Sequence, residues 1–247
     1  MARRWSSRSL SGVAKFRKVG KTVTGDRLKV AVLISGRGSN LQALLDAARD
    51  PLFPAEIVLV ISNIPNVQGL ERAAKAGVPA QAISHKDFPD RQSFERALTD
   101  RLEAAGVELV CQAGFMRIVT PWFVRRWQNR LINIHPSLLP SFPGLHTHAR
   151  ALEAGVKLHG CTVHFVRDEV DVGPIIGQAA IQVGDQDTPD DLAARVLSLE
   201  HQLYPRCLRL LAEGRAKLVG ARVMIEGSQP GADQLLQPSA ASTDPHG

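Results

Sequence analysis

The sequence predicts an α/β fold in which helices cover both faces of a mostly parallel sheet. Two observations support this prediction: short apolar runs alternate with helical segments from residue 29 onward, and the first two runs are apolar at five consecutive positions. Continuous runs of this kind are typical of strands buried on both faces. Alternating strands and helices form right-handed βαβ units around a parallel sheet. Ligands of such sheets bind beyond the carboxyl ends of the strands, so the residues that follow each strand are the first candidates for a site.

The individual elements follow from the same pattern. Strands are expected in six apolar runs, at residues 29–35, 55–62, 109–113, 131–134, 161–166 and 175–183. Helices are expected at residues 40–48, 70–76, 91–105 and 189–211. Gly77 and Gly106 are expected to end the second and third helices, because glycine tolerates the left-handed conformation at a helix end. Thr188 is a suitable N-cap for the last helix, and Pro189 fits its first turn.

Composition indicates an ordinary globular protein. The chain has 247 residues, of which 44% are hydrophobic and 22% are charged, which suits one domain with tails. Every apolar run is shorter than the roughly 20 residues that span a bilayer, which excludes a membrane-spanning protein. The net charge is +6, but the first 25 residues contain no acid and seven basic residues: Arg3, Arg4, Arg8, Lys15, Arg17, Lys18 and Lys21. The remainder is close to neutral, so no nucleic-acid partner is predicted.

The chain ends and the cysteines bear on domain boundaries and location. Residues 1–27 are rich in Arg, Ser and Lys and lack periodicity, so they are expected to be disordered. An organellar transit peptide, a plain tail and a start site assigned too early all fit them. The folded domain is expected over residues 28–226, followed by a flexible tail over 227–247. Three widely spaced cysteines form no disulfide framework, which fits a reducing compartment and a cytoplasmic protein, or an organellar one if residues 1–27 are a transit peptide.

The first segment that could carry chemistry is Ser35–Asn40, between the first strand and the first helix. Its two glycines allow a tight turn, and the helix that follows offers free N–H groups and the positive end of its dipole. These features favour a phosphate-binding turn. The pattern is not the dinucleotide fingerprint, because Leu41 stands where the third glycine belongs. A purely structural turn with a helix cap fits the same residues.

Two further segments follow later strands. Residues 114–119 are mainly apolar with one Arg, and either line a pocket for a flat ligand or form a core loop. Asn133 and His135 are two residues apart, so they project to one side of an extended chain. Both are polar within an apolar strand, where buried polar groups must find partners. An amide and an imidazole aimed at one point favour an oxyanion site, although core residues with satisfied hydrogen bonds fit as well.

Other polar residues are less specific. Asp171 precedes a Gly-Pro turn, and loop acids are usually solvated or cap a turn. It is a catalytic candidate only because the chain also contains the polar residues Asn133 and His135. A metal site could be drawn from the histidines together with this acid. An H-x-H pair at His146 and His148 is weak support for a metal, and we expect none.

Taken together, these segments resemble the glycinamide ribonucleotide formyltransferases, also called phosphoribosylglycinamide formyltransferases, a folate-dependent family with a Rossmann-like fold. The resemblance covers about Lys29 to Arg222. The segments that carry it are LISGRGSNLQAL, AGFMRIVT, LINIHPSLLPSFPGLHTHARAL, HGCTVHFV, DEVDVGPII and LEHQLYP. The chain has Arg167 before Asp168 and Val172 after Asp171, two places at which the family varies.

The resemblance implies an activity in purine biosynthesis: transfer of a formyl group from 10-formyltetrahydrofolate, a co-substrate, to the amine of glycinamide ribonucleotide. It implies a role for twelve residues. The polar trio of Asn133, His135 and Asp171 would be catalytic; Gly38, Ser39, Asn40 and Glu200 would bind the ribonucleotide; Arg91, Met116, Arg117, Ile118 and Val119 would bind the folate. Arg91 and Glu200 rest on the resemblance alone.

The implied mechanism is direct attack of the substrate amine on the formyl carbon. Asn133 and protonated His135 would stabilise the oxyanion, and Asp171 would keep His135 charged and help to relay the amine proton. Neither a covalent enzyme intermediate nor a metal is needed. The expected partners are the two small-molecule substrates, with no nucleic acid and no membrane, and the protein is expected to be a monomer or a homodimer.

Three other functions fit parts of the pattern. Formyltetrahydrofolate deformylase would hydrolyse the same donor, but it carries an N-terminal domain for which residues 1–27 are too few, and it lacks the Gly-Ser-Asn segment. Methionyl-tRNA formyltransferase needs a C-terminal RNA-binding domain, for which the residues after the region of resemblance are too few. A nucleotide-binding module without catalysis would explain the glycine-rich turn but not the polar trio.

Overall fold

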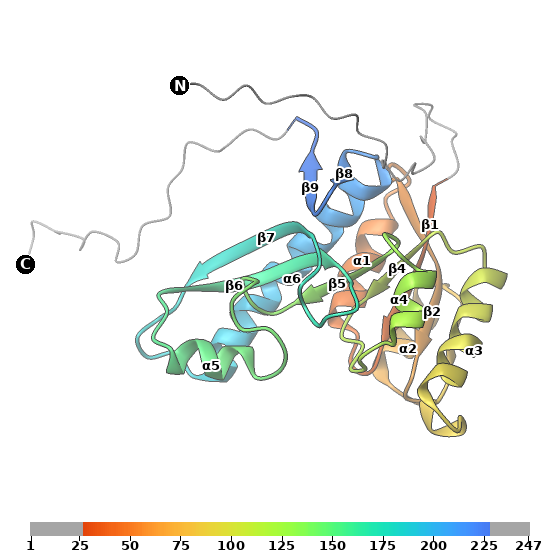
Figure 1. Cartoon of the computed structure of the whole chain (residues 1–247), viewed down its shortest axis with the longest axis horizontal. Coiled ribbons are helices and arrows are strands. Elements are labelled where there is room, and N and C mark those ends of the chain that lie inside the picture. Colours follow the sequence, from red (N-terminus) through yellow and green to blue (C-terminus); the bar gives the residue numbers. More distant parts are fainter. Residues whose placement is uncertain (1–26, 228–247) are drawn as a thin grey trace, which may run out of the picture.

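A seven-stranded sheet forms the centre of the protein in the computed structural model, which describes residues 27–227 (Figure 1). Its strand order is β3-β2-β1-β4-β5-β6-β7. The first five strands are parallel, whereas β6 is antiparallel to β5 and β7 is antiparallel to β6. The strands are β1 (Leu28–Ile34), β2 (Ala55–Ser62), β3 (Ala80–Ala82), β4 (Leu109–Gln112), β5 (Leu131–His135), β6 (Leu158–Phe165) and β7 (Ile175–Gln182).

Helices and a small hairpin complete the fold. The helices are α1 (Ser39–Ala48), α2 (Gln68–Lys75), α3 (Arg91–Ala104), α4 (Pro121–Arg126), α5 (Thr147–Glu153) and α6 (Pro189–Ala212), with a 3-10 turn, η1 (His85–Asp87). The hairpin consists of β8 (Ala216–Val219) and β9 (Arg222–Ile225). Thr188 caps α6 by accepting from the Asp191 N–H, and the Asp191 carboxylate accepts in return from the Thr188 N–H, which completes a capping box. The predicted cap is therefore confirmed.

Two apolar clusters lie on opposite faces of the sheet, which explains why the first two strands each contain five consecutive apolar residues. Alternate residues of β1 point to opposite faces. Val30, Val32 and Ile34 join α1 and α6 in one cluster, whereas Ala31 and Leu33 join α3 and α4 in the other. Each cluster covers one face of the sheet. The predicted fold class, a mostly parallel sheet with helices on both faces, is confirmed.

The strand order places two loops at one edge of the sheet. From β1 the chain moves outward to β2 and β3, then returns to β4 on the other side of β1. Ligands bind at such a reversal because the loops that leave the two strands diverge there. The Ser35–Asn40 segment follows β1, and residues 114–119 follow β4. Because the family resemblance assigns four of residues 114–119 to the folate, they are here called the folate segment.

The structure extends the predicted set of elements. His135 is the last residue of β5 rather than the residue after it, and β6 begins at Leu158, three residues before the expected start. Helix α4 was not predicted, although Thr120 and Pro121 repeat the Thr-Pro start of α6. Helix α5 was not predicted either, because His146 precedes it in a left-handed conformation and supplies no side-chain cap. Strand β3 and the β8–β9 hairpin are too short to give a clear pattern.

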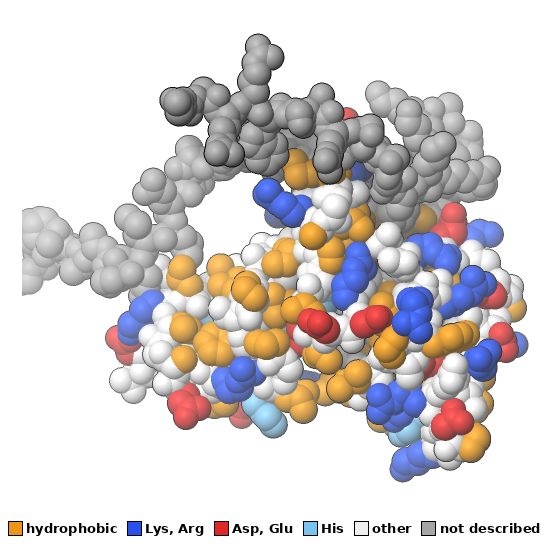
Figure 2. All heavy atoms as spheres, viewed as in Figure 1, with side chains coloured by type: hydrophobic (Ala, Val, Ile, Leu, Met, Phe, Trp, Pro, Cys, Tyr) orange, Lys and Arg blue, Asp and Glu red, His pale blue; other side chains and the backbone are white. Residues whose placement is uncertain are grey.

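The surface and the cysteines complete the description of the fold. Basic and acidic side chains are interspersed on the face shown in Figure 2. Within residues 27–227, no helix has the length and hydrophobicity needed to cross a membrane. All three cysteines are buried and free.

The extension predicted over residues 1–27 lies outside the described residues except for Arg27, whose guanidinium donates to the carbonyls of Ala48 and Ala55, both at 2.6 Å. The tail predicted over 227–247 also lies outside them, apart from Gly227.

Candidate active site

A cavity of about 750 Å³ lies at the carboxyl edge of the sheet. Ten of the twelve predicted site residues line it: Asn40, Arg91, Met116, Arg117, Ile118, Val119, Asn133, His135, Asp171 and Glu200. Gly38 and Ser39 are not among the lining residues. A second cavity, of about 790 Å³ beside the β8–β9 hairpin, is lined by none of the predicted residues. We place the candidate site in the first cavity, because the polar trio gathers there.

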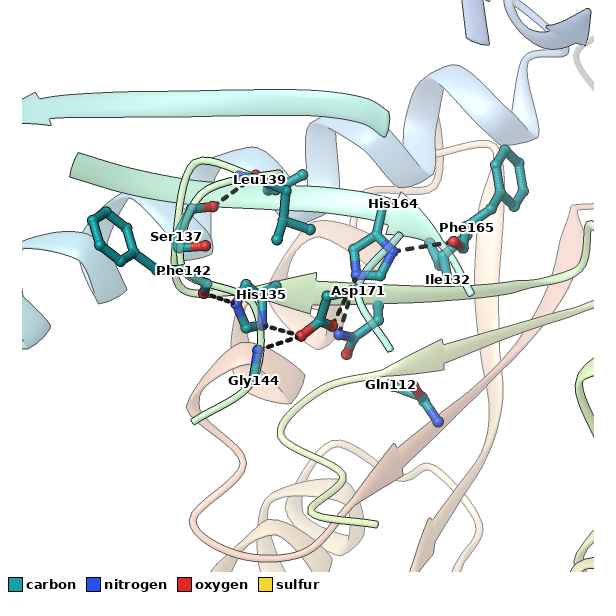
Figure 3. Close-up of polar contacts among 12 residues, drawn as sticks. Gln112, Ile132, His135, Ser137, Leu139, Phe142, Gly144, His164, Phe165 and Asp171 are labelled. Atoms are coloured by element: carbon teal, nitrogen blue, oxygen red, sulfur yellow. Dashed lines mark hydrogen bonds and ion pairs between the residues drawn. The ribbon is translucent and has the colours of Figure 1, made fainter. Parts of the chain in front are cut away.

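The polar trio comes from one strand and one loop. β5 directs Asn133 and His135 to the same face, as their spacing predicts. Asp171 reaches them from the loop between β6 and β7, where its backbone is left-handed with a φ of 59°. Its carboxylate is only 8% exposed, and Oδ2 lies 3.4 Å from His135 Nδ1 (Figure 3). The Gly144 N–H donates to the same oxygen at 2.8 Å, which holds the carboxylate toward the imidazole.

Both ring nitrogens of His135 face oxygen acceptors. Nε2 lies 3.0 Å from the carbonyl oxygen of Phe142, and Nδ1 faces the Asp171 carboxylate. A neutral imidazole has one N–H donor, whereas an imidazolium has two. This arrangement therefore suits a protonated His135, held between a carbonyl and a carboxylate.

His164 is a site residue that the sequence reasoning did not assign. It is buried on β6, directly opposite Asn133 in the antiparallel register. Nδ1 lies 3.1 Å from the Phe165 carbonyl oxygen and can only donate to it. Burial lowers the pKa of His164, which favours the neutral ring. Nε2 is then a lone-pair acceptor, and the Asn133 amide donates to it at 3.4 Å. One N–H of Asn133 is thereby fixed, and the other is directed elsewhere.

A second buried polar pair lies where α1 and α6 meet. Asn40 Nδ2 donates to Glu200 Oε2 at 2.6 Å. Desolvation raises the pKa of Glu200 to about 7, and the hydrogen bond from Asn40 opposes this shift. The family resemblance assigns Asn40 to the phosphate of the ribonucleotide. In the structure one side-chain N–H of Asn40 is engaged by Glu200, and the role of Asn40 at the phosphate stays a prediction.

Backbone groups at the start of α1 remain suitable for an anion. Gly38 is the N-cap, with a φ of 69°, and it has no side chain that could cap the first turn. A Cβ added at Gly38 would lie 2.8 Å from the Cα of Gly69, so both the left-handed φ and this close approach require glycine. The N–H groups of the first helical turn are the donors that an anion would meet.

The folate segment is tethered at both ends and exposed between them. Ser35 Oγ accepts from the Met116 N–H at 2.8 Å, and Ser35 in turn donates to Asn63 at 2.5 Å. Glu95, which is buried, accepts from both the N–H and the hydroxyl of Thr120. Met116 and Ile118 are 69% and 62% exposed. Exposed apolar side chains on a fixed loop suit the covering of a flat ligand.

His148, which lines the cavity, packs against His159 on β6. The rings of His148 and His159 are 5.3 Å apart and nearly perpendicular. Burial lowers the pKa of His159 to about 4, so this ring is neutral near pH 7. Within residues 27–227, no group of three or more His, Cys, Asp or Glu is placed to hold a metal ion.

These features define a class of protein: an α/β protein with an amide, an imidazole and a carboxylate beside a ligand cavity, an arrangement suited to group transfer through an oxyanion. Comparison with known proteins identifies the family. The formyl transferase model matches residues 28–208, and the chain belongs to this family.

Two sequence relatives and two solved structures place the chain within the family. It is 43% identical over 217 residues to phosphoribosylglycinamide formyltransferase of Escherichia coli, which covers 88% of this chain and 100% of that protein. It is 53% identical over 205 residues to the trifunctional purine biosynthetic protein adenosine-3 of Drosophila melanogaster, covering 82% of this chain but spanning only 15% of that protein.

Glycinamide ribonucleotide transformylase 1 of Symbiobacterium toebii superposes with a TM-score of 0.81 at 49% identity, covering 84% of this chain and 99% of that one. Formyltetrahydrofolate deformylase of Burkholderia mallei superposes with a TM-score of 0.74 at 33% identity, covering 81% of this chain and 70% of that one.

Proposed function

We propose that this chain transfers a formyl group from 10-formyltetrahydrofolate to the amine of glycinamide ribonucleotide, a step of purine biosynthesis. The relatives named for this reaction support the proposal, and the Escherichia coli enzyme is matched along its full length. The observation that carries it is the convergence of the polar trio, the Asn40–Glu200 pair and the folate segment on one cavity. A cavity of about 750 Å³ is within the range of known ligand sites.

The polar trio would act on the reacting atoms. The amine nitrogen forms the new bond to the formyl carbon, the bond from that carbon to N10 of the folate breaks, and the proton lost by the amine ends on N10. Asn133 supplies the N–H that His164 leaves free to the oxyanion formed on the way. His135 contributes positive charge beside it, and Asp171 balances that charge and holds the ring. The carboxylate also offers an acceptor for the amine proton, directly or through a water.

The two ends of the cavity would hold the two substrates. The first-turn N–H groups behind Gly38, with Ser39 and Asn40, would bind the phosphate of the ribonucleotide, and Glu200 would accept from its ribose hydroxyls. Arg91 and the folate-segment residues Met116, Arg117, Ile118 and Val119 would bind the folate. Holding both substrates in line can supply several kcal/mol toward the reaction, and the proposed chemistry uses no metal.

The test is the release of tetrahydrofolate from 10-formyltetrahydrofolate by the purified full chain with different acceptors. We expect release only when glycinamide ribonucleotide is present, with one formylated product for each tetrahydrofolate. The similarity to a formyltetrahydrofolate deformylase makes water the control acceptor. Equal release with water alone would replace the transferase by a deformylase, and release with methionyl-tRNA alone would point to a different formyltransferase.

A further inference from the structure

Gln112 is a buried polar residue of the cavity to which neither the sequence reasoning nor the proposed mechanism gives a role. It is the last residue of β4, it is 6% exposed, and it lines the same cavity as the polar trio. Its side-chain nitrogen is enclosed and has no hydrogen-bond partner among residues 27–227. Exchanging the amide nitrogen and oxygen would leave an oxygen without a partner in the same place. A buried amide without a partner is unfavourable, so a ligand group is the natural candidate to complete it.

The backbone of Gln112 is held firmly, although its side chain is free. The Tyr204 hydroxyl on α6 donates to the Gln112 carbonyl oxygen at 2.9 Å from one face of the sheet. The side chain lies on the other face, because Gln112 is in register with Leu33 and Asn133, and Leu33 belongs to the cluster under α3 and α4. The backbone position of Gln112 is therefore fixed, and the strand β4 determines the face of the sheet to which its side-chain amide points.

A row of three polar side chains crosses the sheet at this level. Gln112, Asn133 and His164 are in register on β4, β5 and β6. Asn133 is paired with His164, whereas Gln112 is paired with neither. Figure 3 shows the Gln112 nitrogen directed away from Asp171, which separates this amide from the polar trio.

The surroundings of Gln112 indicate what kind of ligand it meets. β4 leads directly into the folate segment, and the nearby lining includes Phe115, Val119 and Val166, which belong to the apolar cluster on this face. The ribonucleotide end, at Asn40 and Glu200, is built instead from α1 and α6. An apolar wall with one amide suits a flat heterocycle that carries polar atoms along its edge.

We infer that the Gln112 side chain hydrogen-bonds a polar edge atom of the pteridine ring of the folate donor and so helps to select that ring. The inference rests on the proposed function, because it takes the donor to be a folate. Gln112 is then a specificity-determining contact for the donor, distinct from the polar trio.

The test compares Gln112→Leu, which keeps the side-chain volume and removes the amide, with wild type and with Cys111→Ala. Cys111 is the neighbouring residue of β4 and faces the opposite cluster, so it controls for general damage to the strand. We expect Gln112→Leu to raise the KM for 10-formyltetrahydrofolate and the Kd for tetrahydrofolate by about threefold to tenfold, the usual effect of one lost hydrogen bond. The KM for glycinamide ribonucleotide should stay within about twofold. Tm should stay equal or rise, because the enclosed amide is gone.

The outcomes separate the inference from its alternatives. An unchanged Kd for tetrahydrofolate in folded Gln112→Leu would overturn it, and so would a fall in Tm with equal weakening of both substrates, which would show a structural amide. Gln112→Met is the second variant if leucine is not tolerated, and the same two results decide. If wild type transfers no formyl group to glycinamide ribonucleotide, the proposed function fails. If wild type transfers it and Gln112→Leu binds tetrahydrofolate normally, only this inference fails.

Discussion

His135 and Asp171 are buried and held by neighbouring carbonyl and N–H groups, whereas Met116 and Ile118, in the same cavity, are mostly exposed. The first pair is organised without a ligand. The second presents apolar surface that only a ligand would cover. This difference indicates that the cavity separates reaction from attachment: fixed dipoles stabilise the transition state, and exposed apolar surface binds the folate. Variants of the two regions should therefore differ in kcat and KM.

Asp171→Asn should have the largest effect. Asparagine tolerates the left-handed backbone at this position, so the change removes charge with little strain. We expect kcat to fall about a thousandfold, within the range that a positioned proton-transfer group contributes, with the KM for both substrates within about threefold. The measurement is a pH–rate profile with both KM values. Asp185→Asn, an exposed acid beyond β7, is the matched control. If Asp171→Asn keeps the wild-type kcat across the pH profile, Asp171 has no role in the reaction.

Asn133→Ala should follow closely. The loss of one oxyanion donor typically lowers kcat by about a hundredfold to a thousandfold. His164 Nε2 would also lose its donor, so Tm must be measured alongside kcat. A folded variant with near-normal turnover would remove Asn133 from the site.

Glu200→Gln tests the ribonucleotide end through its pH dependence. The folded protein retains a proton on Glu200 up to a pKa of about 7, whereas the ordinary value is 4.5. Glu200 therefore contributes less to stability as pH rises from about 4.5, and its contribution is least favourable above 7. The variant should gain on the order of 2 kcal/mol over wild type at pH 8 and less at pH 5, while its KM for glycinamide ribonucleotide rises. An equal gain at both pH values in denaturant titrations would contradict this assignment.

Ile118→Ala should have the smallest effect and the opposite kinetic signature. We expect the KM for 10-formyltetrahydrofolate to rise about threefold to tenfold, because a covered isoleucine loses part of its apolar contact, with kcat unchanged. Tm should be unchanged, since the side chain is largely exposed. Leu52→Ala, at an exposed leucine outside the cavity, should leave both constants alone. A fall in kcat without a change in KM would mean that the folate segment serves the reaction itself.

The sequence was sufficient for the buried strands and for two members of the polar trio. Strands β1 and β2 are recognisable as strands because each contains five consecutive apolar positions, and these are apolar because both faces of the sheet are covered. Asn133 and His135 stood out as polar residues two apart in such a strand. Asp171 did not, because a loop acid near a Gly-Pro turn has no local pattern, and it became a candidate only in the company of the other polar residues.

The residues that were missed depend on register rather than on local pattern. His164 acts through its place opposite Asn133, and Gln112 through its place beside Asn133. Neither pairing can be deduced from a single strand, because a shift of one residue would turn each side chain to the other face. The Asn40–Glu200 contact joins positions 160 residues apart, which local spacing cannot reveal either.

The 160-residue separation between Asn40 and Glu200 also bears on how proteins with this fold can acquire different acceptors. The polar trio lies within residues 133–171, whereas the end that would choose the acceptor joins α1 to α6 from opposite ends of the domain. Substitutions at that end could exchange one acceptor for another while the trio stays intact. A formyltetrahydrofolate deformylase and glycinamide ribonucleotide transformylases share this fold. Evolution of a new acceptor would then need only a few changes on two helices, without rebuilding the strand that carries the amide and the imidazole.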